Sequence, residues 1–186
     1  MPAYAYFILV AGIVVWFYPF VSAHKGTGPA RVVNRRSRWG VLLQLAAHTL
    51  LWQGHFWVRS LPAWRTALSV GLFAIAAVLS WTSSHALRGQ LRVDAGLGAD
   101  HKLVRSGPYR LVRHPIYTSM LVVICATAVI IAPWPLFLGS LILFVAGTEI
   151  RVRTEERLLA SQFGEEFQEY KRAVPAYIPF WRSDEA

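Results

Sequence analysis

Charged residues are absent from four long stretches of the chain, which cover residues 1–24, 39–58, 66–87 and 114–148. An α-helix rises about 1.5 Å per residue, so roughly 20 apolar residues cross a hydrocarbon core about 30 Å thick. The first three stretches therefore predict one membrane-spanning helix each. The first one lacks a basic segment ahead of its apolar run, so we expect a retained helix and not a cleaved signal peptide.

The fourth stretch is too long for one span and contains Pro133 and Pro135. These prolines flank Trp134, a pattern that is typical of a tight turn at a membrane face. We therefore predict a hairpin of two helices, near 116–132 and 134–150. The chain then has five predicted transmembrane helices.

The composition favours an all-α integral membrane protein with a single domain over residues 1–186. Hydrophobic residues make up 55% of the chain and charged residues 16%, compared with about 25% charged in a typical soluble domain. A nucleic-acid-binding protein needs a polar surface, and a disordered tail is poor in aromatic residues. The single cysteine, Cys125, excludes an internal disulfide and a cysteine-based zinc site. We expect no metal.

Basic residues lie mainly in three segments, which follow the first, third and fifth predicted helices. Seventeen of the nineteen Lys and Arg residues fall within 24–38, 88–113 and 151–182, and only Arg59 and Arg65 lie elsewhere. Cytoplasmic segments carry an excess of Lys and Arg. We therefore expect the N-terminus outside and the C-terminus in the cytosol. The net charge of +9 then reflects this bias and attraction to anionic lipids, without any nucleic acid.

Polar chemistry is expected in the second half of the chain. We divide the domain into three N-terminal spans over 1–87 and a second half over 88–186. The second half comprises a cytosolic loop (88–114), the helical hairpin (115–150) and a cytosolic tail (151–186).

The tail carries its own structural signals. It is predicted to continue as a helix over 149–163, to end or bend at Gly164, and to form a short helix over 165–172. The aromatic residues beyond it suit an anchor at the membrane interface; they are Tyr177, Phe180 and Trp181.

Arg113 and His114 lie where the fourth helix is predicted to begin, and Pro115 suits the first helical position, where a backbone N–H has no helical partner. A helix N-terminus presents free N–H groups that favour a carboxylate or a phosphate. Arg113, His114 and Tyr117 would add donors there. The alternative is a basic loop that binds lipid headgroups.

Arg151, Arg153, Glu155 and Glu156 follow the fifth predicted helix. Adjacent carboxylates near an anionic membrane surface are unfavourable unless they meet a cation, so they suggest a site for a cationic or hydroxyl-rich ligand. The alternative is a solvated helix with surface ion pairs, each worth about 0–1 kcal/mol. Because a hairpin brings both segments to one membrane face, together they favour a zwitterionic ligand with an ammonium and a carboxylate.

The second predicted span contains polar residues that share one helix face. His48 and His55 are seven residues apart, and Gln44 and Gln53 lie in the same segment. We interpret them as interhelical hydrogen-bonding residues, since no carboxylate or cysteine joins them to form a zinc site. Small residues of the fifth span are expected to allow close helix packing.

Two motifs together resemble a known family. The sequence SGPYRLVRHPIY at 106–117 is followed by RTEERLLASQFGEEFQEYKRAVP at 153–175. In order and spacing they are similar to the isoprenylcysteine carboxyl methyltransferases and the related phospholipid methyltransferases, over residues 94–182. The N-terminal half is similar only as hydrophobic spans. It has fewer helices than the eukaryotic enzymes of the family, which suggests a small prokaryotic member.

The resemblance implies an integral membrane methyltransferase that uses S-adenosylmethionine and releases S-adenosylhomocysteine. It implies a cofactor pocket formed by the cytosolic loop and the C-terminal helices, with an arginine that faces the substrate carboxylate. Two alignments are open, so this arginine is Arg151 or Arg153. The implied cofactor-binding residues are His101, Lys102, Leu103, Val104, Tyr109, His114 and Tyr117, with Glu155 or Glu156.

The resemblance also implies a lipidic methyl acceptor, with a prenylcysteine-like carboxylate as the first expectation and a methyl ester as the product. A carboxylate is already ionised at pH 7, whereas a phospholipid amine must first lose a proton and would need a base. The alternatives are a phospholipid amine N-methyltransferase, an NADPH-dependent reductase of the sterol type, and a non-catalytic membrane scaffold. We expect a multi-pass protein of a prokaryotic cytoplasmic membrane, with its site on the cytosolic face and no obligate protein partner.

Overall fold

The chain is a bundle of helices in the computed structural model, which describes residues 1–22, 37–58, 60–87 and 102–179. Every regular element in these ranges is helical, as the sequence predicts. The helices are α1 (Ala3–Ser22), α2 (Ser37–Leu51), η1 (Phe56–Val58), α3 (Ala63–Leu87), η2 (Gly107–Arg110), α4 (Pro115–Ile131), α5 (Trp134–Phe163) and α6 (Glu165–Ala173), where η marks short 3₁₀ turns.

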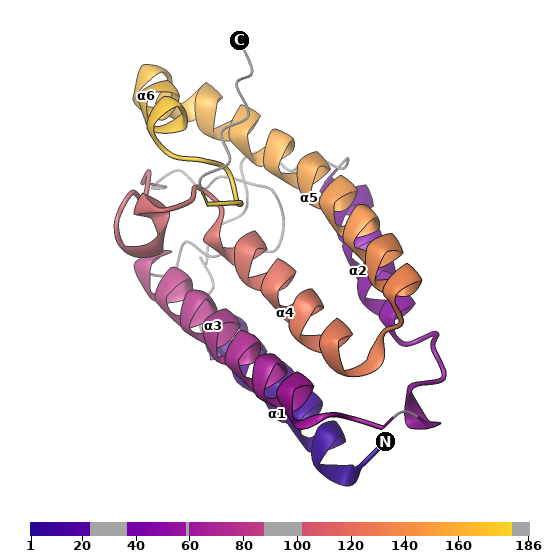
Figure 1. The fold of residues 1–186 in the computed structure, drawn as a ribbon. Coiled ribbons are helices and arrows are strands. Elements are labelled where there is room, and N and C mark those ends of the chain that lie inside the picture. Colours follow the sequence, from indigo (N-terminus) through magenta and orange to yellow (C-terminus); the bar gives the residue numbers. More distant parts are fainter. Residues whose placement is uncertain (23–36, 59, 88–101, 180–186) are drawn as a thin grey trace.

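The long helices form two pairs, with α4 between them. Figure 1 shows α1 beside α3 and α2 beside α5. The Ser69 hydroxyl of α3 donates to the Ala126 carbonyl of α4 at 2.8 Å. The hairpin partners α4 and α5 therefore have different main neighbours: α4 packs chiefly on α3 and α5 chiefly on α2. Their closest polar contacts are at the end that carries α6.

Small residues bring α2 and α5 into close contact, as predicted for the fifth span. A Cβ atom added to Gly40 would lie 2.6 Å from the Gly147 carbonyl oxygen, and one added to Gly147 would lie 2.7 Å from the Gly40 carbonyl oxygen. The Ser140 hydroxyl donates to the Ala47 carbonyl at 2.8 Å. These contacts fix the register of α5, and with it the position of the charged residues at its end.

The second predicted span is wrong at its C-terminal end. α2 ends at Leu51, and the chain turns through Gln53 and Gly54, where a Cβ on Gly54 would lie 3.0 Å from Pro133. This close approach to the turn before α5 stops the helix from continuing. His55 is exposed beyond the helix end, so it does not share a helix face with His48.

The fifth predicted helix and the tail helix are one element. α5 runs unbroken from Trp134 to Phe163, because no Gly or Pro interrupts 148–163. The pairs Glu149–Arg153 and Arg151–Glu155 support its charged end with contacts of 3.2 Å and 3.4 Å. The charged part begins at Glu149, near the end of the predicted span 134–150, and continues beyond it.

Three of the described helices, α1, α3 and α5, are long and apolar enough to cross a membrane. α4 has 17 residues and α2 has 15, which correspond to roughly 26 Å and 22 Å. Both helices are shorter than a typical span, although they lie within the same bundle (Figure 1). The integral membrane class is supported, and the number of five spans stays a prediction.

The chain turns back after α5. Gly164, at φ 53°, ends α5 as predicted, and α6 buries Phe167 and Tyr170. The segment after α6 then runs along the start of α4, where Tyr177 is only 5% exposed. The prediction that Tyr177 anchors the membrane interface is therefore wrong, because this side chain packs inside the protein; Phe180 and Trp181 lie outside the described residues.

Candidate active site at the start of α4 and the end of α5

α4 begins at Pro115, as the sequence predicts, directly after His114. The N–H groups of Arg113 and His114 donate to the carbonyls of Pro175 and Ala176, both at 2.8 Å, and the N–H of Tyr117 donates to the His114 carbonyl at 3.0 Å. These three backbone donors at the start of the helix are thus used within the protein and are not free for a ligand. The chemistry of the site therefore rests mainly on side chains.

The first group of side chains joins α4 to α5 through Tyr117. Arg151 Nε donates to the Tyr117 hydroxyl at 2.6 Å, and this hydroxyl donates to Glu155 Oε1. Arg151 Nη2 lies 3.4 Å from the same carboxylate oxygen. A phenol held between a guanidinium and a carboxylate has one preferred hydrogen-bond direction, so the three side chains are fixed relative to one another.

His114 bridges two carboxylates. Its Nδ1 lies 3.5 Å from Glu155 Oε2 and its Nε2 lies 3.4 Å from Glu156 Oε1. Burial alone would lower the pKa of His114, but hydrogen bonds and charge interactions with both glutamates raise it above 6.5 overall. The carboxylates therefore favour the protonated, positively charged form of the imidazole.

Glu156 is held by three cationic side chains. Arg113 donates to its Oε1 from Nη2 at 2.7 Å and from Nε at 2.8 Å, and Lys171 Nζ lies 3.2 Å from its Oε2. Burial alone would raise the pKa of Glu156, but His114 and Arg113 hold it well below its usual range. Its side chain is only 9% exposed, compared with 25% for Glu155. The two neighbouring glutamates therefore have different surroundings.

The structure separates the two candidate arginines. Arg151 is 7% exposed and contacts the site, and a Cβ on Gly40 would lie 2.5 Å from its Cγ, so α2 also holds it in place. The Arg153 side chain is 61% exposed and pairs with Glu149 at 3.2 Å. The geometry therefore favours Arg151 and Glu155 over the alignment that selects Arg153 and Glu156.

The remaining predicted residues lie before and within η2. Tyr109 is buried, its carbonyl accepts the Tyr170 hydroxyl at 2.6 Å, and burial together with Tyr170 and Glu155 raises its pKa. Lys102 is exposed, whereas Leu103 and Val104 are half-buried. His101 lies outside the described residues, so its predicted contact stays a prediction.

Sequence reasoning missed two residues that complete the site from the C-terminal segment. The Tyr177 hydroxyl donates to Glu149 Oε1 at 2.7 Å, and its backbone carbonyl accepts the Thr118 hydroxyl at 2.6 Å. Lys171, in the last turn of α6, pairs with Glu156 of α5. Neither contact has a helical spacing that the sequence reveals, although the prolines after α6 signal that the chain stops being helical there.

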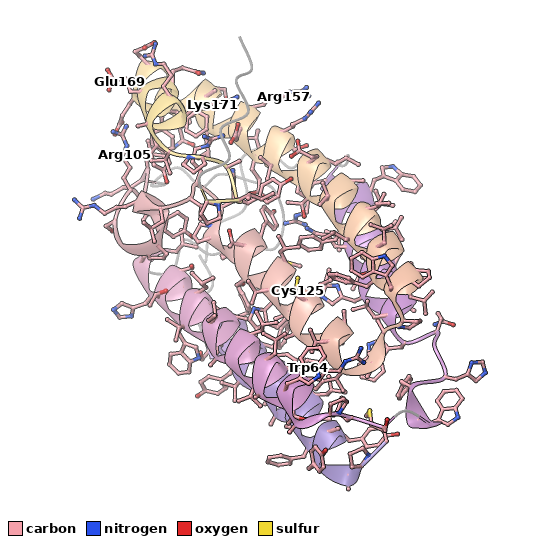
Figure 2. All side chains as sticks on the ribbon, in the orientation of Figure 1. Trp64, Arg105, Cys125, Arg157, Glu169 and Lys171 are labelled. Atoms are coloured by element: carbon pink, nitrogen blue, oxygen red, sulfur yellow. The ribbon has the colours of Figure 1, made fainter. Side chains whose placement is uncertain are left out.

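A hollow of about 410 Å³ lies beside η2 and α6. It is lined by Arg105, Arg110, Glu169, Tyr170, Ala173 and Val174. Figure 2 shows Arg105, Glu169 and Lys171 gathered at this end of the molecule, while Cys125 lies halfway along α4 and Trp64 near the opposite end. The titratable cluster and the hollow thus occupy the α6 end, and Cys125 is remote from both.

A comparison with protein families bears on this arrangement. The family model described as phospholipid methyltransferase matches residues 64–166, which include α4, η2 and α5. The match covers more than half of the chain. The chain belongs to the phospholipid methyltransferase family. The matched range includes both the RHPIY motif at 113–117 and the RTEE motif at 153–156.

Curated relatives carry methyltransferase names. The chain is 36% identical to a protein-S-isoprenylcysteine O-methyltransferase of Schizosaccharomyces pombe over 81 residues, which are 43% of this chain and 34% of the relative. It is 27% identical to methanethiol S-methyltransferase 2 of Bradyrhizobium diazoefficiens over 162 residues, 78% of this chain and 60% of the relative.

A third relative has a different kind of name. The cobalt-zinc-cadmium resistance protein CzcN of Cupriavidus metallidurans is 38% identical over 80 residues, which are 43% of this chain and 37% of that protein. In all three comparisons the chain spans less than two thirds of the relative's length. The names of these relatives thus refer to more than one chemistry.

Proposed function

We propose that this protein is an S-adenosylmethionine-dependent methyltransferase of the membrane. The single observation that carries the proposal is the cluster of Glu155, His114, Tyr117 and Arg151, in which a carboxylate lies beside two cationic side chains. Such a cluster suits an amino acid, which carries an ammonium and a carboxylate. Family membership supports the same conclusion.

The chemistry of these side chains fits the cofactor. Glu155 is the more exposed of the two glutamates, so it is the carboxylate that we assign to the cofactor ammonium. His114, whose protonated form is favoured because its pKa is raised, suits the cofactor carboxylate. Glu156 is assigned no contact with the cofactor; it acts indirectly, by binding Arg113. The remaining proposed contacts come from the chain before α4, at His101, Lys102, Leu103, Val104 and Tyr109.

When bound, S-adenosylmethionine supplies an electrophilic methyl group on a sulfonium. Methyl transfer needs the acceptor in line with this group, so the protein contributes chiefly by holding and orienting. We assign the acceptor side to Arg151, whose guanidinium can orient a carboxylate through paired hydrogen bonds. Tyr117 and Gly40 keep that guanidinium in place.

The acceptor that we favour is a prenylcysteine-like carboxylate, which would give a methyl ester. Arg151 favours an anionic acceptor, and a carboxylate needs no base because it is ionised at pH 7. The second candidate is a thiol, because a relative named for methanethiol matches 78% of this chain. A phospholipid amine is the third, since the amine would need a base.

We further propose a membrane domain of five spans, with the N-terminus outside and the site at the cytosolic face. The half over 88–186 would be catalytic, and the three spans over 1–87 would support it. The concentration of basic residues in the segments after α1, α3 and α5 supports this orientation. A lipidic acceptor would then reach the site from the bilayer and the cofactor would arrive from the cytosol.

Binding of S-adenosylhomocysteine tests the cofactor assignment. Isothermal titration of the detergent-purified chain is expected to show binding that Glu155→Gln abolishes, because the amide removes the charge with little change in shape. NADPH is the comparison ligand. A folded wild-type protein that binds NADPH and not S-adenosylhomocysteine would overturn the proposal in favour of a sterol-type reductase.

Transfer of a labelled methyl group tests the acceptor. We would compare a farnesylcysteine analogue, a small thiol and phosphatidylethanolamine in the same membranes. Arg151→Gln is expected to reduce transfer to the carboxylate, whereas Arg153→Gln, on the same helix but exposed, is expected to leave it near wild type. Loss of transfer in Arg153→Gln alone would select the other alignment.

A further inference from the structure

The segment of the chain after α6 closes over the start of α4. Two successive N–H groups, those of Arg113 and His114, donate to two successive carbonyls, those of Pro175 and Ala176, at 2.8 Å each. The Thr118 hydroxyl donates to the next carbonyl, that of Tyr177, at 2.6 Å. We call residues 171–177, which are the last turn of α6 and the segment after it, the C-terminal strap. It accepts the His114 N–H, one of the backbone donors that a helix N-terminus leaves open, together with the N–H before it and the Thr118 hydroxyl.

One guanidinium joins this strap to α5. Arg113 Nε and Nη2 bind Glu156 Oε1 at 2.8 Å and 2.7 Å, while Nη1 donates to the carbonyls of Lys171, at 2.9 Å, and Val174. The Arg113 side chain is 6% exposed. A guanidinium offers donors in a planar fork, so Arg113 can hold the carboxylate and both carbonyls at once, whereas a lysine ammonium is a point charge on a flexible stem.

The same contacts determine which glutamate remains available. Glu156 Oε1 accepts from Arg113 and faces His114 at 3.4 Å, and Glu156 Oε2 faces Lys171 at 3.2 Å. Both of its oxygens are therefore occupied within the protein. Glu155 Oε1 accepts from the Tyr117 hydroxyl and faces Arg151 at 3.4 Å, and its Oε2 faces His114 at 3.5 Å. Its side chain is nevertheless 25% exposed, compared with 9% for Glu156, so Glu155 is the glutamate that a ligand can reach.

We propose that Arg113 and Glu156 are a positioning pair, which latches the C-terminal strap onto α4 and so sets His114 and Glu155 for the ligand. The inference rests on the proposed function for the identity of that ligand. Its geometric basis does not depend on the ligand, because the contacts of Arg113 and Glu156 join the start of α4, α5 and the strap directly. Arg113 and Glu156 themselves do not touch the ligand in this assignment.

Conservative variants are needed, because removing one partner of a buried ion pair leaves an uncompensated charge. Arg113→Lys keeps the positive charge and loses the fork. Glu156→Gln keeps the shape and loses the negative charge. Glu155→Gln is the matched comparison one residue away, and Arg172→Gln is the control, because Arg172 is a 70% exposed arginine of α6 that pairs only on the surface with Glu165.

Two measurements on the full chain in detergent distinguish the roles. Hydrogen exchange reports on the amides of Arg113 and His114, which the strap protects, and titration reports the affinity for S-adenosylhomocysteine. We expect Arg113→Lys to accelerate exchange at these amides at least tenfold and to weaken binding, with thermal unfolding close to wild type. Glu156→Gln should have the same two effects at a lower unfolding temperature, because it leaves the buried Arg113 charge without its carboxylate. We expect Glu155→Gln to lose binding with unchanged exchange.

Several results would overturn the proposal. One is unchanged exchange in both Arg113→Lys and Glu156→Gln; another is Glu156→Gln behaving like Glu155→Gln, with lost binding and intact strap protection. Accelerated exchange with wild-type affinity would also refute it. If wild type fails to bind S-adenosylhomocysteine while the exchange results hold, the cofactor assignment is wrong and the latch alone is supported.

Discussion

His114 is the residue whose charge links the two glutamates, and its protonation should therefore set the pH range of stability. Its folded pKa is raised above 6.5 by Glu155 and Glu156, against the opposing effect of burial. A group with a raised folded pKa contributes its stabilisation fully below its unfolded pKa and loses it as the pH rises through the folded value. Tyr117, Arg113 and Lys171 also border this cluster.

We predict that wild type unfolds at a higher temperature than His114→Gln at pH 6, and that the difference shrinks as the pH rises above 6.5. Thermal unfolding in detergent across this pH range measures it. Glutamine keeps a hydrogen-bonding side chain, so the comparison isolates the charge. A difference that stays constant, or grows, toward higher pH would contradict a positively charged His114 in the folded protein.

Tyr117 contributes through one oxygen atom. Its hydroxyl accepts from Arg151 at 2.6 Å and donates to Glu155, and hydrogen bonds to charged groups are worth about 1.5–3 kcal/mol. We predict that Tyr117→Phe weakens S-adenosylhomocysteine binding by roughly tenfold or more, since both charged partners lose their link while the ring packing is kept. Titration calorimetry measures the change.

Tyr6→Phe is the control for Tyr117→Phe, because Tyr6 is 41% exposed on α1. It should bind the ligand like wild type. Equal affinities for Tyr117→Phe and Tyr6→Phe would show that the Tyr117 hydroxyl has no part in the site.

At the scale of elements, the contact between α2 and α5 determines where Arg151 lies. A Cβ on Gly40 would approach the Arg151 Cγ at 2.5 Å and the Gly147 carbonyl oxygen at 2.6 Å. We predict that Gly40→Ala destabilises the protein by about 1–3 kcal/mol, as overpacking does, and also weakens ligand binding. Thermal unfolding and titration measure the two effects.

Gly71→Ala is the matched control for Gly40→Ala. A Cβ at Gly71, on α3, has no heavy atom within 4 Å, so this variant should unfold at or above the wild-type temperature. A Gly40→Ala variant that behaves like Gly71→Ala would mean that α2 and α5 are farther apart than the structure shows.

The sequence predicted the helices from their lack of charge, but it predicted their ends and neighbours less well. Pro115, Gly164 and the turn at Pro133 are local signals, and each marks an element boundary in the structure. The end of α2 at Leu51 depends on the approach of Gly54 to Pro133, which is a tertiary contact. Such a contact leaves no periodic trace in the sequence.

The same distinction applies to the site. Proximity of His114 to Glu155 follows from the hairpin, so the sequence could predict it. The choice between Glu155 and Glu156 depends on Arg113, Lys171 and the C-terminal strap, which the motif alone does not place.

At the scale of the whole molecule, the short helix α2 decides the topology. Its 15 residues are roughly 22 Å long, which is shorter than a typical span, yet it packs closely on α5 within the same bundle. If α2 crosses the membrane, the turn after it lies on the same side as the turn between α4 and α5. The end of α5 then lies on the opposite side, where the basic segments favour the cytosol.

Single cysteines in a Cys125→Ala background test this arrangement. We predict that a membrane-impermeant maleimide labels Gln53→Cys and Trp134→Cys on intact bacterial cells, and labels Ser161→Cys only after permeabilisation. All three positions are exposed in the structure, so accessibility within the protein is comparable. Labelling of Gln53→Cys only after permeabilisation would show that α2 returns without crossing, because its length then fails to span the roughly 30 Å core.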